Sequence, residues 1–417
     1  MLPRRRTKLW ERVGVDEVAL AKLKESLQSA IELEWATIPP YLTAWLSIKD
    51  GANGDVSDML HGIFVDEMRH MALAANMLNA IGGKPVLNDP GKAPRYPGPL
   101  PAGALEHLTV TLEKMSTEQT EKVFMEIETP ECDDTVTKFY RHLSKAAAPE
   151  ASKKYERSRK LEDAFPGLWA NCCEGGYIPD TIGAIYIHKI LCPMMKLEVK
   201  ARAKGTIFTG DPGRQLTSPF EVSDISTAIK AVAQIVSQGE GGDPCNPYVD
   251  DQFTEKEKDT CHYFKFAEIV EGKKVEYGGN PDPRKRYFSP CGSDCEDELA
   301  FSGDDVTFNE DDVWPIISNP QADFYRPGSN ARDLSDEFNK VYTDLMLCLH
   351  EAVNGYPEKM GTCKNFMRAL RDKGNKMVKE PITPGDDPNV GPNVSPTFEF
   401  NYGAQEQQYQ QQQRIEL

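Results

Sequence analysis

The stretch FVDEMRHMALAANMLNAIGG, residues 64–83, decides the fold, because it sets an acid and an imidazole among regularly spaced apolar residues. The apolar positions recur at steps of three and four: Leu60, Ile63, Phe64, Ala74, Met77 and Ile81. This is the period of a helix packed on one face, and Glu67 and His70 fall on the same stripe. Gly82 and Gly83 provide a C-cap signal that ends the helix. We therefore expect a helix over about residues 57–81 with a carboxylate and an imidazole facing its core.

The helical period returns along the chain and predicts a mainly α fold. A first helix is expected over residues 16–48, with a disturbance near Pro39 and Pro40. Ser116 and Gln119 form a possible capping box for another helix, which stops before a proline at position 130. Later helical stretches cover residues 180–203, 223–238, 254–270, 335–353 and 357–378. These segments predict a helical bundle with additional helices.

Composition divides the chain into four expected regions. Residues 1–272 form the helical bundle with the candidate site, although the polar part from 131 to 178 is ambiguous. Residues 273–332 are rich in Gly, Pro, Asp and Asn and predict an irregular insertion or linker. Residues 333–380 predict a helical pair packing on the bundle. Residues 381–417 predict an extended segment and a disordered Gln-rich tail, which lacks the apolar side chains needed to order itself.

Charge and motifs exclude several classes of function. The chain has 48 Lys+Arg against 65 Asp+Glu, a formal charge of -17, which disfavours nucleic acid and acidic membranes as partners. The basic N-terminus has no apolar h-region behind it, and no apolar run approaches transmembrane length, so a soluble cytoplasmic protein is expected. Serine-hydrolase, Walker and Rossmann motifs do not occur in the sequence, so those chemistries lack support.

The ten cysteines are scattered, and Cys172 and Cys173 are adjacent, so free thiols are expected. Cys291 and Cys295 form a C-x3-C pair that has no second pair or His cluster nearby. Such a pair is a weak signal for a metal site.

The apolar stripes of other helices also lead to acids. The stripe of the first helix runs through Ile31 to Glu34, which leaves Glu32 on the outer face. A four-residue step from Phe124 reaches Glu128 and leaves Glu126 outside.

Two later positions follow the same rule. The stripe of the helix over residues 223–238 points to Glu240, although the glycines beside it are also a signal for the end of a helix. His262 shares a face with Phe266 and Ile269. Together with the earlier helices, this gives four carboxylates and two imidazoles on inward faces.

Burying a carboxylate ion costs several kcal/mol, and burying several together adds repulsion, so a cation is needed to offset them. A pair of metal ions does this in four-helix di-iron carboxylate proteins. Their ligands are a Glu from each of two helices and a Glu-x-x-His from each of the other two. Glu67 and His70 have that spacing.

Other interpretations apply to each residue alone. A Glu-x-x-His pair usually lies on a solvated face, and Glu34 or Glu128 could pair with a buried Arg or Lys. Glu240 could lie on a surface loop, and His262 could be a core histidine bonded to a backbone carbonyl. The agreement of independent stripes favours metal. His188 is either a core histidine or a substitute or supporting ligand.

Several segments resemble the ferritin-like domain of the iminophenylpyruvate dimer synthase family, of the violacein and rebeccamycin pathway type. The similar segments span most of residues 20–272: AIELEWATIPPYLTAWLSI, DEMRHMALAANMLNAIGGKP, FMEIETPE, TIGAIYIHKI, IVSQGEGG and CHYFKFAEI, with SPTFEF near the C-terminus. The resemblance implies a ferritin-like four-helix bundle, and the sequence pattern adds further helices and a long irregular insertion to it.

The resemblance also implies a carboxylate-bridged iron centre of one or two ions. Carried over residue by residue, its ligands fall on matching positions: Glu34, Glu67, His70, Glu128, Glu240 and His262. Ala184 and Ile187 stand where a second Glu-x-x-His could be sought. Either Glu240 and His262 complete the second half of the centre, or one metal ion binds firmly.

Three hypotheses for function follow. The leading one is an iron-dependent oxidoreductase, a non-haem oxidase or oxygenase, that uses O2 on a small, amino-acid-derived substrate of specialised metabolism. In it, Glu67 and Glu128 bridge two ferrous ions. The second is an imine-dimer synthase that couples aromatic imino acids, assisted by the metal or a haem. The third is a non-catalytic metal-binding or scaffold protein. A monomer or small homo-oligomer is expected.

Overall fold

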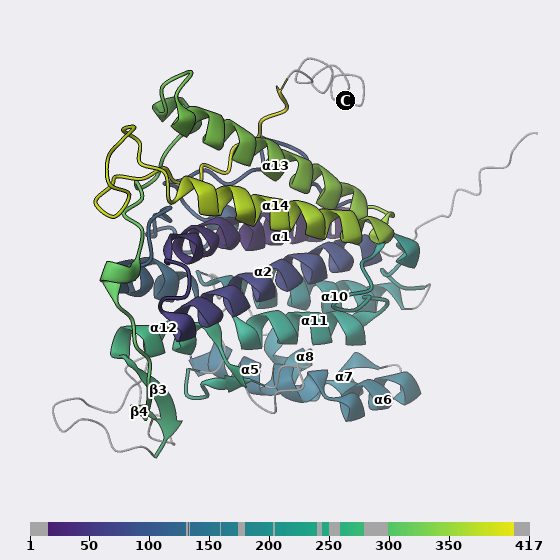
Figure 1. Ribbon diagram of the computed structural model, residues 1–417. Helices are drawn as coiled ribbons and strands as arrows, with labels where there is room; N and C mark the ends of the chain where they lie inside the picture. The colour runs from purple at the N-terminus through teal and green to yellow at the C-terminus, as the bar shows by residue number, and fades with distance from the viewer. Residues whose placement is uncertain are drawn as a thin grey trace, which may run out of the picture.

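The computed structural model describes residues 16–130, 132, 134–158, 160–173, 180–202, 205–239, 244–249, 259–278 and 299–403. The described chain is mainly helical, as the sequence predicts, with a few short strands. Figure 1 shows α1 and α2 in the middle of the molecule, with α13 and α14 on one side and α10 and α11 on the other. The helices that carry the candidate site therefore lie in the interior layers.

Helices α1 (Glu17–Ser47) and α2 (Gly54–Ala80) form the central pair. The Asp16 side chain caps α1 by accepting a hydrogen bond from the backbone of Ala19, 3.0 Å away. The helix continues through Pro39 and Pro40, where the sequence predicts a disturbance. Both prolines are buried, so we attribute the continuity to packing that outweighs the two lost backbone donors.

The next two helical stretches each contain a π-helical segment. One stretch consists of α3 (Thr117–Gln119), η2 (Thr120–Phe124) and α4 (Met125–Ile127). Ser116 caps it by accepting from the backbone of Gln119, 3.0 Å away, but the Gln119 side chain bonds to Thr111, so only half of the predicted capping box forms. The other stretch consists of α9 (Ile182–Ile185), η3 (Tyr186–Leu191) and α10 (Cys192–Ala201). Such π segments often mark functional sites.

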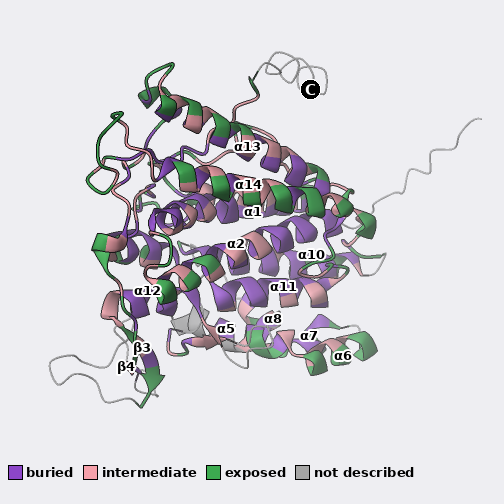
Figure 2. Cartoon of the chain, in the orientation of Figure 1, coloured by how far each residue is buried: buried purple, intermediate pink, exposed green. Residues whose placement is uncertain are grey.

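Two further helices complete the inner layers. Helix α11 (Ile225–Gln238) begins with a capping box of Asp224 and Thr227. Helix α12 (His262–Glu271) begins eight residues later than the sequence pattern predicts, because residues Asp259–Thr260 form the strand β2. Figure 2 shows that most residues of α11 and α12 on the inner side are buried.

The region that is ambiguous in sequence forms an outer helical layer beside α11. Its helices are α5 (Asp134–Ala147), α6 (Pro149–Ser158), α7 (Leu161–Ala164) and α8 (Pro166–Cys173). Three of these helices have ten residues or fewer, so few turns are available to show a helical period in the sequence.

The expected irregular insertion contains regular structure. Within it, strand β3 (Lys273–Tyr277) pairs antiparallel with β4 (Leu299–Asp305). Before it in the chain, β1 (Tyr248–Val249) pairs antiparallel with β2. Val275 and Leu299 are buried together against α12 residue Phe264. Short single turns of 3-10 helix are η1 (Pro101–Gly103), η4 (Pro212–Arg214), η5 (Glu310–Asp312), η6 (Ala322–Phe324) and η7 (Pro357–Lys359).

Helices α13 (Asn330–Ala352) and α14 (Met360–Met377) lie over α1 (Figure 1). The indole of Trp35 in α1 donates a hydrogen bond of 2.7 Å to the hydroxyl of Tyr342 in α13. The Gln-rich tail predicted to be disordered lies outside the described residues. None of the described helices is long and apolar enough to cross a bilayer.

Disulfides contradict the expectation of free thiols. Cys172 bonds to Cys192, and Cys348 bonds to Cys363. Cys132 and Cys245 are also disulfide-bonded, whereas Cys173 and Cys261 are free. The paired sulfurs come together only after helices pack, which sequence spacing does not reveal. Disulfides persist in oxidising compartments, which weighs against the expected cytoplasmic location.

Candidate metal centre

Five ligand-type side chains meet in the interior of the bundle. Glu34, Glu67, His70, Glu128 and His262 each have 0% of their surface exposed. They form two groups in which one ligand atom from each residue lies within 4.8 Å of the others. The first group joins Glu34, Glu67 and His70, and the second joins Glu67, Glu128 and His262. Glu67 belongs to both groups.

Several elements supply these side chains. Glu34 lies on α1, and Glu67 and His70 lie one turn apart on α2. Glu128 follows α4 and remains in its last turn, since its backbone donates to the carbonyl of Phe124 at 3.1 Å. His262 is the first residue of α12, which lets its ring reach the centre from the end of a helix.

Each carboxylate has one oxygen held by a hydroxyl group. Thr37 donates to Oε2 of Glu67 at 2.8 Å. Tyr41 donates to Oε1 of Glu128 at 2.6 Å. Tyr186 donates to Oε1 of Glu34 through a short hydrogen bond. These bonds fix the carboxylates and leave the second oxygen of each one turned toward the centre.

Both histidines present Nδ1 to the centre and are held from behind through Nε2. Nε2 of His70 lies 3.2 Å from the side-chain oxygen of Gln238, and Nε2 of His262 lies 3.5 Å from Oδ2 of Asp66. Metal-binding histidines commonly donate their outer nitrogen to a carboxylate or carbonyl in this way. Asp66 is itself paired with Arg69 at 2.6 Å. The arrangement orients both imidazoles toward the carboxylates.

The five inward atoms have no hydrogen-bond partner among the described residues: Oε2 of Glu34, Oε1 of Glu67, Nδ1 of His70, Oε2 of Glu128 and Nδ1 of His262. Nδ1 of His262 lies 3.0 Å from Oε1 of Glu67 and 3.5 Å from Oε2 of Glu128, yet neither contact has hydrogen-bond geometry. Nδ1 of His70 lies 3.6 Å from Oε1 of Glu67.

Buried polar atoms are nearly always bonded, so this cluster needs a partner of another kind. In the described part of the chain, no Lys or Arg forms an ion pair with Glu34, Glu67 or Glu128. Structural ion pairs with a basic side chain therefore do not explain the buried acids. Oxygen and imidazole donors suit divalent iron, manganese or zinc. The residues present fit a pair of metal ions that share Glu67.

The electrostatics of the cluster reflect the same crowding. Burial and the nearby charge of Glu67 raise the pKa of Glu34 well above its ordinary value, and burial also raises the pKa of Glu128. Burial opposes ionisation of Glu67, but His262 and His70 beside it outweigh burial and lower its pKa. Without metal, the raised pKa values favour protonated Glu34 and Glu128, and a bound metal ion would replace those protons.

The pKa values of the two histidines are shifted in opposite directions. Burial lowers the pKa of His70, which favours the neutral ring. Burial acts in the same sense on His262, but the charge of Glu128 and the contact with Asp66 outweigh it and raise the pKa of His262 well above its ordinary value.

Gly239 leaves room for the centre. A Cβ at this position would lie 3.1 Å from Nδ1 of His262, 3.2 Å from Oε2 of Glu128 and 3.3 Å from Cε1 of His70. The residue follows α11 with a φ of -106°, which any residue can adopt. A side chain here would press on three ligand side chains, so glycine leaves space between them.

Other residues singled out in the sequence lie elsewhere. Glu240, Cys291 and Cys295 fall outside the described residues. His188 lies against Phe139, with ring centroids 6.2 Å apart, and belongs to neither ligand group.

The segment from Ala184 to Ile187 contributes the hydroxyl of Tyr186 in place of a second Glu-x-x-His. Sequence reasoning also missed Thr37, Tyr41, Asp66 and Gln238. Their only signal is position: Thr37 and Tyr41 follow Glu34 at helical steps, Asp66 precedes Glu67, and Gln238 ends α11.

Two comparisons with known proteins found a match. A family model described as ferritin-like matches residues 27–271. A solved ferritin-like protein from Caulobacter vibrioides is similar at 19% identity and a TM-score of 0.47, covering 85% of this chain and 96% of that chain. No match was found among curated proteins.

Proposed function

Because the chain belongs to the ferritin-like family, we propose that its buried centre holds two iron ions and that the protein is an oxidoreductase using O2 on a small molecule. The observation that carries the proposal is the convergence of five unbonded ligand atoms in the interior. A buried cluster of this composition is costly without cations. The iron, when bound, would supply the redox chemistry with O2.

One ion would be held by Glu34, His70 and Glu67, and the other by Glu67, Glu128 and His262. This assignment differs from a centre bridged by Glu67 and Glu128 together, because Glu128 belongs to one ligand group only. Three carboxylates would offset most of the charge of two ferrous ions, so the filled centre is close to neutral.

The remaining groups control the surroundings of the centre. The hydroxyls of Tyr41 and Tyr186 each donate a hydrogen bond to a ligand carboxylate. The hydroxyl of Thr37 donates one to the carboxylate of Glu67, which both ions would share. These donors stabilise the ionised carboxylates and keep their second oxygens in place. The side chains of Phe124 and Phe266 pack around Tyr41 and exclude water from this side.

The nature of the substrate rests on the resemblance to the iminophenylpyruvate dimer synthase family. That resemblance supports a small, amino-acid-derived substrate of specialised metabolism and an oxidative reaction. Coupling of two aromatic imino acids is the version to test first. Incubation of the iron-loaded protein with an aromatic imino acid under air should consume O2, and a coupled product would identify the reaction as dimer formation.

The ligand assignment is tested by metal content in matched variants. Glu67→Gln should bind neither ion firmly, because Glu67 serves both groups, whereas Glu128→Gln should retain about one ion per chain. Glu126→Gln is the control, since Glu126 is exposed and only two residues from Glu128. Iron should be measured by elemental analysis after anaerobic loading with ferrous ion.

The variants also separate an enzyme from a scaffold. An oxidoreductase loses O2 consumption in Glu67→Gln and keeps it in Glu126→Gln. Firm iron binding without any O2 consumption across candidate substrates would favour a non-catalytic metal-binding protein. Equal iron content in all three variants would contradict the proposed centre.

A further inference from the structure

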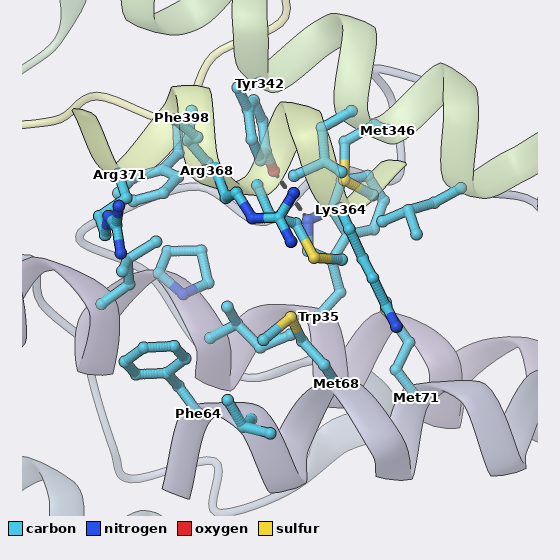
Figure 3. A pocket seen from close by; sticks show the side chains of 18 of the residues that line it. Trp35, Phe64, Met68, Met71, Tyr342, Met346, Lys364, Arg368, Arg371 and Phe398 are labelled. Atoms are coloured by element: carbon cyan, nitrogen blue, oxygen red, sulfur yellow. Dashed lines mark hydrogen bonds between the residues drawn. The ribbon is translucent and has the colours of Figure 1, made fainter. Parts of the chain in front are cut away.

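A second cavity lies on the opposite side of the central helix pair. It has a volume of about 280 Å³ and is bounded by α1 and α2 on one side and by α13 and α14 on the other (Figure 3). Its walls are apolar and include Trp35, Leu42, Phe64, Met68, Met346 and Phe398. Nine of the twenty lining residues are Trp, Phe, Tyr or Met, which suits an irregular or flexible apolar ligand.

This cavity is separate from the candidate metal centre. Along α1, Trp35, Ile38, Leu42 and Trp45 line the cavity, whereas Glu34, Thr37 and Tyr41 face the centre. Within each set, the residues follow one another at steps of three and four. The two sets are offset by one position, so they occupy different faces of the helix. None of the five ligand side chains of the candidate centre lines the cavity.

The wall formed by α14 is basic. Lys364, Arg368 and Arg371 line the cavity and are spaced by four and three residues, so they share one face of the helix. Figure 3 shows the three side chains at the opening between the helix layers. The lining contains no Asp or Glu, although the chain as a whole has a net charge of -17. The basic groups are therefore not neutralised from within the cavity.

The partners of these cations are few. Among the described residues, Lys364 has neither a hydrogen bond nor an ion pair. Arg368 donates only to the amide oxygen of Asn365, at 2.9 Å. Arg371 pairs with the exposed Asp372 at 3.3 Å. Lys364 and Arg368 are exposed, so an anionic group at the edge of the cavity can pair with both.

We propose that this cavity binds a small amphipathic anion, with its apolar body between the two helix layers and its anionic head at Lys364 and Arg368. Apart from His61 and the Tyr342 hydroxyl, which accepts a bond from Trp35, the lining away from α14 is apolar, so a polar body would find few partners there. A volume of about 280 Å³ lies near the lower end for ligand sites and fits a small molecule. The inference does not rest on the proposed function of the metal centre.

The test compares ligands that share a chain and differ in the head group. Decanoate, decyl phosphate, decanol and decyltrimethylammonium are titrated below their micelle concentrations into the full-length protein, by calorimetry and by the fluorescence of Trp35 and Trp45. The proposal predicts that an anion binds at least about tenfold more tightly than decanol, and that the cation binds most weakly. The stronger of the two anions identifies a carboxylate or a phosphate ester as the preferred head.

Variants locate the site. Lys364→Gln combined with Arg368→Gln should weaken anion binding about tenfold and leave decanol binding unchanged. Lys376→Gln is the matched control, because Lys376 is an exposed cation of the same helix that does not line the cavity. Leu345→Trp, which fills the cavity, should abolish binding of all four ligands while circular dichroism reports an unchanged fold.

Two results would overturn the proposal. One is equal affinity for decanoate, decyl phosphate and decanol. The other is anion binding that survives both the double variant and Leu345→Trp, since binding would then occur elsewhere on the protein.

Discussion

At the scale of single residues, each ligand of the candidate centre has one polar atom bonded to a neighbouring side chain and the other directed toward the centre. Glu34, Glu67 and Glu128 each give one oxygen to a hydroxyl and turn the other inward. His70 and His262 divide their ring nitrogens in the same way. Inward ligand atoms that are fixed from behind lose little freedom when a metal binds, which favours affinity.

Metal binding should release protons. Glu34, Glu128 and His262 have raised pKa values in the metal-free protein, so each holds its proton to a higher pH than usual. A metal ligand must be deprotonated, so affinity should increase as pH rises and fall as pH is lowered. Calorimetry in two buffers of different ionisation enthalpy should show protons released on binding. A pH-independent affinity with no proton release would contradict these pKa shifts.

Gly239→Ala should weaken metal binding without unfolding the protein. The added Cβ would come within 3.3 Å of three ligand side chains and displace them from the centre. We expect iron affinity to fall by about tenfold or more, as for changes that disturb ligand orientation. Gly62→Ala on α2 is the control, because a Cβ there meets no atom within 4 Å. Equal affinity in both variants would show that the space beside Gly239 is not needed.

At the scale of elements, α1 and α2 each serve two sites. One face of α1 carries Glu34, and another lines the apolar cavity through Trp35 and Ile38. The apolar stripes in the sequence predict the buried positions of Glu34, Glu67, His70, Glu128 and His262, because helical geometry alone determines which residues share a face.

Helical geometry does not predict which side chains from other elements meet these faces. Tyr186 reaches Glu34 from a π segment, and its neighbours carry no sequence pattern that identifies it as a partner. The pairings of Cys172 with Cys192 and of α5 with α11 likewise depend on packing between elements. These parts of the fold require the three-dimensional structure.

The disulfide between Cys348 and Cys363 should stabilise the α13–α14 pair. It closes a loop of 15 residues, for which the chain-entropy estimate is about 3 kcal/mol. Replacing both cysteines with Ala should lower the free energy of unfolding by roughly that amount, measured by denaturant titration of the oxidised protein. Adding a reductant too mild to reduce the other disulfides should not lower the free energy of unfolding of this double variant any further. Unchanged stability would mean that this bond does not form.

At the scale of the whole molecule, a helical bundle with a buried acidic centre carries an outer pair of helices over one face. The mainly α fold and most inner helices follow from the sequence. The helices between residues 134 and 173 and the β3–β4 pair do not, because their apolar faces are short and only packing reveals them. The predicted position of Glu240 lies outside the described residues.

Loading the centre should stabilise the entire fold. Ferrous ion bound at the proposed centre would offset the repulsion among three buried carboxylates of the folded chain. With free metal at about a hundred times the dissociation constant, the gain should be about 2.7 kcal/mol. Thermal unfolding under anaerobic conditions should show a higher midpoint with iron in the unaltered protein and a much smaller shift in Glu67→Gln.

The proposed centre has two metal positions that share Glu67. Crystals of the protein loaded with ferrous ion should be measured above and below the iron absorption edge. We expect two anomalous peaks, one between Glu34, His70 and Glu67 and the other between Glu67, Glu128 and His262. A difference map without iron at either position would contradict it.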